Sequence, residues 1–169
     1  MRTLLAMALL MLCIGVGAAK QGRMRRRAAV LGALERDILA LRDAMELSPG
    51  RLADHIRALN APELAEFWGR FAERLALREP VESLWRALVE KEKEAGVFTS
   101  LRGEDSAVLL RVGEALSLPG REAQLARLNL HARELGQQKA EAEAELSKKG
   151  KMVSSLGALI GLALALMVI

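Results

Sequence analysis

The sequence predicts an all-α protein: a membrane-anchored helical bundle whose two long helices continue from terminal transmembrane segments, with about four short helices between them. Three observations lead to this prediction. Ala, Leu, Arg and Glu dominate the 169 residues, Tyr is absent and only 4 are Pro, a composition that favours helices. Uncharged apolar stretches occupy both ends of the chain. Next to each stretch, apolar residues recur every three or four positions, which is the helical period.

The two terminal stretches predict transmembrane helices at residues 3–19 and 152–169. The second contains no charged residue, and a helix of this stretch would be about 27 Å long at 1.5 Å per residue, close to the thickness of a bilayer core. The first contains Cys13, the only cysteine, so a disulfide framework is excluded. We therefore expect three parts: transmembrane helix 3–19, a central helical domain 20–151, and transmembrane helix 152–169.

Basic residues cluster on the inner side of both apolar stretches. Between Ala28 and Ser147, by contrast, 21 acidic residues outnumber 16 basic ones, which argues against a nucleic-acid-binding face. The positive-inside rule places such clusters in the cytoplasm, so we expect a cytoplasmic central domain and both termini outside the cytoplasm. The predicted membrane-boundary collar consists of Arg23, Arg25, Arg26, Arg27, Lys148, Lys149 and Lys151.

The first apolar stretch allows a second interpretation, as a cleaved signal peptide. Arg2, the apolar run and Gly17-Ala18-Ala19 have the order of such a peptide. The protein would then be an exported, tail-anchored helical adaptor whose mature chain begins at Lys20. The basic residues that follow Ala19 oppose export, so a retained helix is the favoured interpretation.

Two heptad stripes predict long helices that pair antiparallel, as in a coiled coil. The first stripe ends at Ser48-Pro49-Gly50, where a helix boundary is expected. The second begins after Pro119-Gly120 and is interrupted by Lys139. The first stripe comprises Leu31, Leu34, Ile38, Leu41 and Met45, and the second Leu125, Leu128, Ala132, Leu135, Ala142 and Leu146.

Four shorter helices are predicted at residues 51–59, 62–77, 80–95 and 104–118. All aromatic residues except Phe98 fall in the second and third of these, so we expect the core to be anchored there. The alternating charges at 90–94 predict a solvated helix end. The predicted core residues are Leu34, Ile38, Leu41, Phe67, Phe71, Trp85, Leu88, Leu128 and Leu135.

No pattern indicates catalysis, a metal site or a cofactor. His131 and Glu134 have the i, i+3 spacing of some metal ligands, but His55 is the only other histidine, so ligands are too few. Gly15-Val16-Gly17 lies in an apolar helix, where a dinucleotide-binding turn is not expected. We therefore predict a protein that is not an enzyme.

Small residues recur along one face of the C-terminal apolar segment. Gly157 and Gly161 are spaced so that a neighbouring helix could approach closely, although lipid-facing filler has the same composition. The partner would be the first segment, another copy of the chain, giving a homo-oligomer, or a different protein. The predicted packing residues are Ser154, Gly157, Ala158 and Gly161.

Several local patterns together resemble the stage III sporulation protein AB family of endospore-forming bacteria. They are Leu34-Glu35-Arg36-Asp37-Ile38, Ser48-Pro49-Gly50-Arg51-Leu52, the segment from Phe67 to Leu75 with Trp85, Gly113-Glu114-Ala115-Leu116 with Gln124, and Lys151 to Gly157 with Gly161. Ser117 and Gly120 depart from the family pattern, which has Gly and Asp there.

The resemblance implies a function that composition does not. The family belongs to the channel-like, secretion-like apparatus that joins mother cell and forespore, and is related to the inner-membrane platform protein of type II secretion and type IV pilus systems. The chain would then be a scaffold in the mother-cell membrane facing the forespore. Its partners would be membrane lipid, a cytoplasmic hexameric ATPase and other stage III membrane components. We expect the acidic, charge-mixed short helices to form the docking surface.

Overall fold

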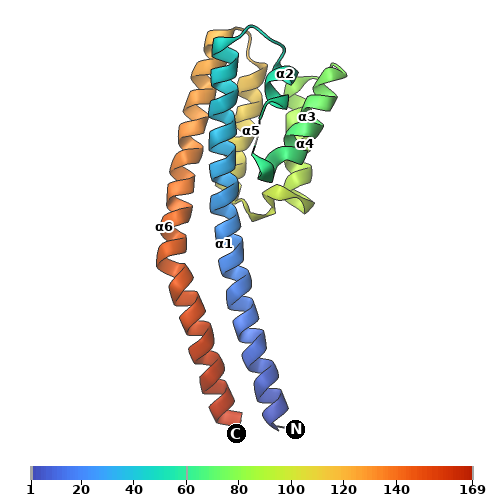
Figure 1. The fold of residues 1–169 in the computed structure, drawn as a ribbon. Helices are drawn as coiled ribbons and strands as arrows, with labels where there is room; N and C mark the ends of the chain where they lie inside the picture. Colours follow the sequence, from blue (N-terminus) through green and yellow to red (C-terminus); the bar gives the residue numbers. More distant parts are fainter. Residues whose placement is uncertain (1, 60, 169) are drawn as a thin grey trace. The chain divides into compact units, whose positions relative to one another are not determined.

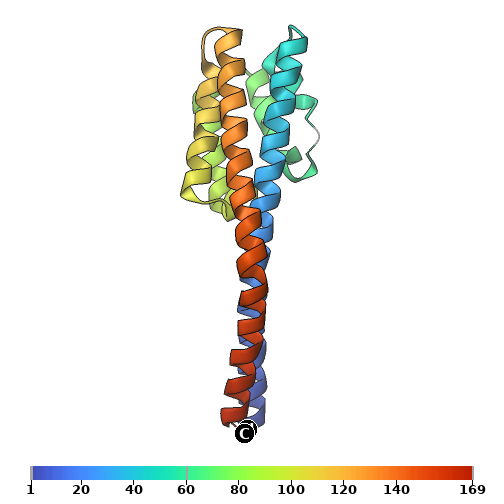
Figure 2. The ribbon, with the colours of Figure 1, turned by 90° about the vertical axis from the view of Figure 1, so that its left-hand side faces the viewer.

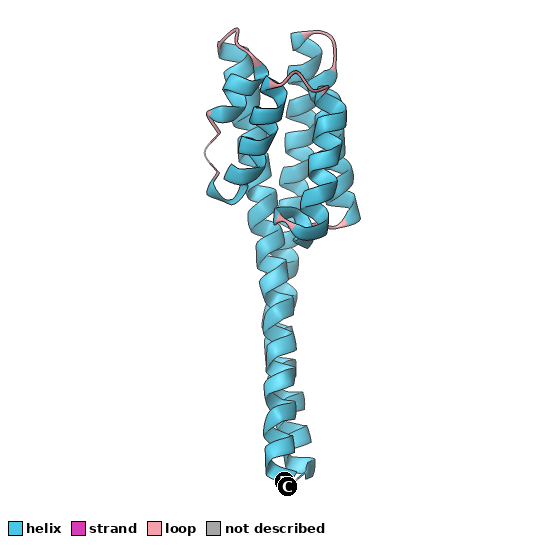
Figure 3. Ribbon diagram, turned by 90° about the vertical axis from the view of Figure 1, so that its right-hand side faces the viewer, coloured by secondary structure: helices cyan, strands magenta, loops and turns pink. Residues whose placement is uncertain are grey.

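The computed structural model describes the backbone of residues 2–59 and 61–168, and the side chains of residues 15, 17–59 and 61–148. Every regular element in these residues is a helix (Figure 3), which confirms the predicted all-α class. The chain divides into two compact units. Unit 1 comprises residues 1–28 and 140–169, and unit 2 comprises residues 29–139.

Two long helices, each with a part in both units, begin and end the chain. Helix α1 spans Arg2–Leu47 and helix α6 spans Arg121–Val168. Helix α1 ends where Ser48-Pro49-Gly50 predicts its boundary. The Arg121 guanidinium donates hydrogen bonds to the carbonyl oxygens of Met45 and Glu46, so the start of α6 satisfies carbonyls that the last turn of α1 leaves free.

The predicted short helices are present, with boundaries shifted by a few residues. They are α2 (Leu52–Arg57), a 3₁₀ turn η1 (Pro62–Leu64) leading into α3 (Ala65–Ala76), α4 (Val81–Ala95), and α5 (Gly103–Ser117). A second 3₁₀ turn, η2 (Val97–Ser100), joins α4 to α5 and was not predicted. Gly120, where the family pattern differs, has a φ of 99°, a backbone region that favours glycine.

Within unit 2, α1 and α6 run antiparallel and side by side (Figures 1 and 2). Leu31, Leu34, Ile38 and Leu41 of α1 are fully buried, as are Leu128 and Leu135 of α6. These positions of the two predicted stripes are therefore sequestered from water, whereas Met45 and Leu125 are half-buried.

A partly buried ion pair explains why Lys139 interrupts the second stripe. Its Nζ lies 3.2 Å from Glu35 Oε2 on α1. The Lys139 stem crosses Gly32, whose Cβ would lie 3.3 Å from Lys139 Cε, while the Glu35 carboxylate lies over Gly136 of α6. Each long side chain thus occupies space that a glycine on the opposite helix leaves open.

Five aromatic rings form the centre of unit 2. The Phe67 ring contacts Trp68, Trp85 and Phe98, with ring centroids 5.1, 5.3 and 4.9 Å apart. Phe71 packs edge-on against Trp85 at 5.1 Å. Such edge-to-face pairs stabilise a core beyond simple burial. Phe98 is fully buried, so η2 also contributes to the aromatic part of the core, which the sequence analysis expected to be anchored in α3 and α4.

Unit 1 contains the remaining parts of α1 and α6, which also lie side by side (Figure 1). Arg27 Nη1 lies 3.8 Å from Glu145 Oε2, which shows that these two residues lie beside each other on the helix pair. Among the described residues no helix is long and apolar enough to cross a membrane. The predicted segments 3–19 and 152–169 lie almost wholly outside the residues whose side chains are described.

Candidate functional site

Two of the family-like sequence patterns meet in a buried hydrogen bond. Trp68 of α3 donates through Nε1 to Asp37 Oδ2 of α1, at 2.6 Å, and both residues are at most 4% exposed. Burial removes the Asp37 carboxylate from water and raises its pKa, although the hydrogen bond from Trp68 opposes this shift. This bond holds α3 against α1.

A third family-like pattern, around Gly113, meets the second at Trp85 of α4. Its Nε1 donates to the carbonyl oxygen of Leu109 at 2.7 Å, on α5. A Cβ on Gly113, one turn later, would lie 2.3 Å from Trp85 Cδ1, so only glycine admits the indole at this position. At the end of α5, Gln124 Nε2 donates to the carbonyl oxygens of Leu116 and Leu118, at 3.0 and 2.9 Å.

A buried carboxylate connects α3, α4 and η2. Glu92 is 4% exposed; its Oε1 lies 2.5 Å from Arg70 Nη2, and its Oε2 accepts a hydrogen bond from the backbone of Val97 at 3.0 Å. The close approach of Glu92 excludes a side chain at Gly96. The prediction of a solvated end is therefore wrong for Glu92, whereas Glu90, Lys91, Lys93 and Glu94 are exposed.

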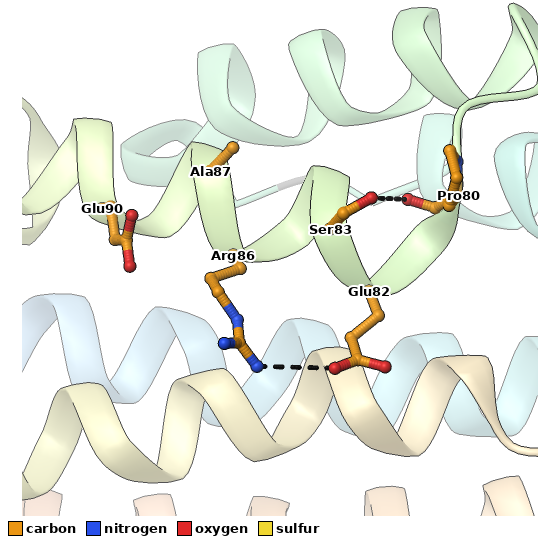
Figure 4. Close-up of a pocket in the computed structure, with 6 residues that line it drawn as sticks. All are labelled: Pro80, Glu82, Ser83, Arg86, Ala87 and Glu90. Carbon is orange, nitrogen blue, oxygen red and sulfur yellow. Dashed lines mark hydrogen bonds and ion pairs between the residues drawn. The ribbon is translucent and has the colours of Figure 1, made fainter.

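These contacts hold the inner side of α4 against the rest of unit 2. The outer side of α4 is exposed and carries charges of both signs. Leu84, Trp85, Leu88 and Val89 point inward and are buried. A shallow groove on the opposite side is lined by Pro80, Glu82, Ser83, Arg86, Ala87 and Glu90 (Figure 4), which we call the α4 face. Its polar groups are aligned by contacts of their own: Arg86 Nη2 lies 3.4 Å from Glu82 Oε1, and the Ser83 hydroxyl donates to the carbonyl oxygen of Pro80 at 3.2 Å.

The structure places the nine predicted core residues in the interior of unit 2: Leu34, Ile38, Leu41, Phe67, Phe71, Trp85, Leu88, Leu128 and Leu135 are each at most 4% exposed. Asp37 and Glu92 join them, and sequence reasoning missed both. A single acidic residue in a charged helix resembles its exposed neighbours. For Asp37, the one indication of burial in the sequence was its neighbour Ile38, which belongs to the first heptad stripe.

The predicted collar residues do not form a uniform set. Arg23, Arg25, Arg26 and Lys148 are exposed, whereas Arg27 is buried against Glu145. The side chains of Lys149 and Lys151 lie outside the described residues, as do those of the predicted packing residues Ser154, Gly157, Ala158 and Gly161.

His131 takes part in a cluster that ties α6 to α5. Its Nδ1 lies 3.1 Å from Glu134 Oε2, which also accepts a hydrogen bond from Arg111 Nη2 at 2.9 Å. The Arg111 guanidinium is the main reason that the pKa of Glu134 is lowered. No group of three side chains able to hold a metal ion occurs in the described part of the chain.

The model of the stage III sporulation protein AB family matches residues 2–169. Neither a comparison with curated proteins nor one with solved structures gave a match. The family is a component of the assembly that operates at stage III of sporulation, and the match extends over both long helices and all short ones. Together with the meeting of its characteristic residues in one core, this match shows that the chain belongs to the stage III sporulation protein AB family.

Proposed function

We propose that the chain is a non-enzymatic platform subunit of the channel-like complex between mother cell and forespore. The observation that carries the proposal is the family match over residues 2–169. In this function, the ends of α1 and α6 anchor the protein in the mother-cell membrane and unit 2 lies in the cytoplasm. The exposed cations at the inner side of both apolar segments support this orientation.

Unit 2 receives the cytoplasmic ATPase of the apparatus on the α4 face. Docking by a motor requires a surface that does not yield when it is loaded, and the α4 face lies on the aromatic core through Trp85 and on α3 through Glu92. Glu82 and Arg86 are each about half exposed, so their charges are accessible to a partner. Such rim charges govern partner selection and association rate.

Charge reversal on the α4 face tests this proposal. In this proposal the partner presents basic groups to Glu82 and Glu90. In full-length protein, Glu82→Lys with Glu90→Lys is then expected to reduce recovery of the ATPase in a pull-down by about tenfold or more, because like charges across an interface cost several kcal/mol. The matched control is Glu104→Lys with Glu114→Lys, two exposed carboxylates of α5. Equal recovery with both double variants would exclude the α4 face as the docking surface.

A topology experiment separates the platform from the exported adaptor. Single cysteines at Lys93, which is exposed on α4, and at the C-terminus are labelled in intact cells with a membrane-impermeant thiol reagent, in a Cys13→Ser background. The platform requires a protected Lys93 position and a labelled C-terminus. Labelling at position 93, with a mature chain that begins at Lys20, would instead support the adaptor with a cleaved signal peptide.

A further inference from the structure

The cations of unit 1 differ from those of unit 2 in what surrounds them. The first acidic residue of the sequence is Glu35, so Lys20, Arg23, Arg25 and Arg26 have no carboxylate neighbour along their own helix. All four are exposed. Arg27 is the exception, because it is 5% exposed and ion-paired with Glu145.

The antiparallel register brings the two basic clusters to one level. Arg27 lies beside Glu145, and each step toward the start of α1 is matched by a step toward the end of α6, at 1.5 Å per residue. Arg23 to Arg26 are therefore level with residues 146–149, the turn that carries the exposed Lys148. Lys149 and Lys151 follow in the sequence.

No carboxylate partner occurs among the described residues for five exposed cations of unit 1: Lys20, Arg23, Arg25, Arg26 and Lys148. Within unit 2, by contrast, Arg57, Arg74, Arg86 and Arg111 each lie within ion-pair distance of a carboxylate. The arrangement leaves several positive charges together on one short length of a helix pair, without internal neutralisation. Such a cluster attracts an external anion strongly.

We infer that Lys20, Arg23, Arg25, Arg26 and Lys148 form a single belt that binds the headgroups of anionic phospholipids. The inference rests on the proposed function, because it requires the helix ends beyond the belt to lie in a bilayer. The guanidinium groups suit phosphate oxygens, to which arginine can donate two hydrogen bonds at once. On each of the two helices an apolar stretch begins within a few residues of the belt, as a headgroup-level site requires.

A nucleic acid fits the molecule less well than lipid. Unit 2 carries 18 acidic and 16 basic residues, so it offers no extension of the positive surface along which a polyanion could run. On α1 the belt extends only from Lys20 to Arg26, about 9 Å of helix. This length suits a layer of headgroups better than an extended polyanion.

The belt predicts selective retention of anionic lipid by the full-length protein. Purified protein in neutral detergent is incubated with equimolar phosphatidylglycerol and phosphatidylcholine, and bound lipids are counted by native mass spectrometry. We expect a preference for phosphatidylglycerol that weakens as ionic strength rises. Each cation near an anionic surface contributes about fivefold in affinity. The combined substitutions Arg23→Gln, Arg25→Gln and Arg26→Gln should therefore lower the preference for phosphatidylglycerol by on the order of a hundredfold.

Two further variants make the result specific. Lys148→Gln, on the other helix, should lower the preference by about fivefold, because the belt draws on both helices. The control combines Arg51→Gln, Arg127→Gln and Arg133→Gln, three exposed arginines of unit 2, which removes the same charge and should leave lipid binding unchanged. If this control lost the lipid preference equally, net charge alone would explain the effect and the belt would be refuted.

The failure of the belt can be distinguished from the failure of the proposed function. Wild-type protein that washes off membranes in alkaline carbonate would refute the anchored platform and the belt together. Protein that stays in the membrane fraction but binds both lipids equally would refute the belt alone. If a single-stranded oligonucleotide displaces phosphatidylglycerol, and its own binding falls in the Arg23, Arg25 and Arg26 variant, the belt would be a nucleic-acid site instead.

Discussion

At the residue scale, the two tryptophans show how side chains of unit 2 are fixed by single polar contacts. Trp68 donates to a carboxylate of α1, and Trp85 donates to a backbone oxygen of α5. A buried indole N–H without an acceptor would destabilise the fold. The two indoles therefore specify where α3 and α4 pack, in addition to filling the core.

Replacing Asp37 by Asn is expected to stabilise unit 2 in a pH-dependent way. The amide oxygen can still accept the Trp68 hydrogen bond, while the cost of a buried charge disappears, so the free energy of unfolding should rise by about 1 kcal/mol at neutral pH. Because burial raises the folded-state pKa of Asp37 above 3.8, this group reduces stability as pH rises from 3.8 through the raised value.

Denaturant unfolding at several pH values, followed by tryptophan fluorescence, measures the Asp37 effect. The gain from Asp37→Asn should be largest at neutral pH and should vanish well below pH 3.8, where the wild-type carboxyl is neutral in both states. Asp54→Asn, at an exposed carboxylate of α2, serves as the control. A stability loss from Asp37→Asn at neutral pH would contradict this account.

Gly113→Ala is expected to destabilise unit 2 by about 1–3 kcal/mol, the range for overpacking a tight core. The added Cβ would overlap Trp85 Cδ1 and Cγ, at 2.3 and 2.6 Å, and the indole is held by its hydrogen bond to Leu109. The control is Gly69→Ala on α3, where no neighbour lies within 4 Å and alanine should gain about 0.5–1 kcal/mol from helix propensity. If the two variants shift the midpoint of thermal unfolding in opposite directions, the packing account is supported; equal shifts would refute it.

At the scale of elements, the pairing of α1 and α6 could be predicted because it depends on repetition. Five stripe positions at the helical period indicate a buried face whatever the exact partner. The 3₁₀ turn η2 and the burial of Phe98 and Glu92 could not be predicted in the same way, because they depend on a short connection and on contacts between different elements. The role of Lys139 was missed because its space is provided by Gly32, far away in the sequence.

A double-mutant cycle on Glu35 and Lys139 should give a coupling energy of about 0.2–1 kcal/mol, as for other partly exposed ion pairs. In a Gly136→Ala background, the new Cβ would lie 2.5 Å from Glu35 Oε1 and displace the carboxylate. We therefore expect the coupling to fall toward zero there, although the alanine itself favours the helix. Chemical denaturation of the variants measures the cycle, and an undiminished coupling in the alanine background would show that Gly136 does not provide the space.

At the scale of the whole molecule, the placement of charge is uneven between the units. Unit 1 carries nine basic and three acidic residues, whereas unit 2 carries 16 basic and 18 acidic ones. The sequence predicted this asymmetry directly, since it is a matter of order along the chain. It could not predict that Arg27 is withdrawn from the collar by Glu145, because this pairing requires the register of two helices that are far apart in the sequence.

The combined Arg23→Gln, Arg25→Gln and Arg26→Gln substitutions are expected to leave the unfolding of unit 2 unchanged, within about 0.5 kcal/mol. None of the three arginines belongs to unit 2. Thermal unfolding observed by tryptophan fluorescence measures this directly, since Trp68 and Trp85 both lie in unit 2. A large shift in the transition would mean that the two units do not unfold independently.

The aromatic cluster also gives the chain a built-in optical probe. Tyrosine is absent and the only two indoles lie with ring centroids 5.6 Å apart, so near-ultraviolet absorption and emission report on one place in the molecule. Rings this close and this rigidly held should give a strong near-ultraviolet circular dichroism signal. Trp85 is on α4, directly beneath the α4 face, so the arrival of a partner there could be followed on the unlabelled protein by a change in emission.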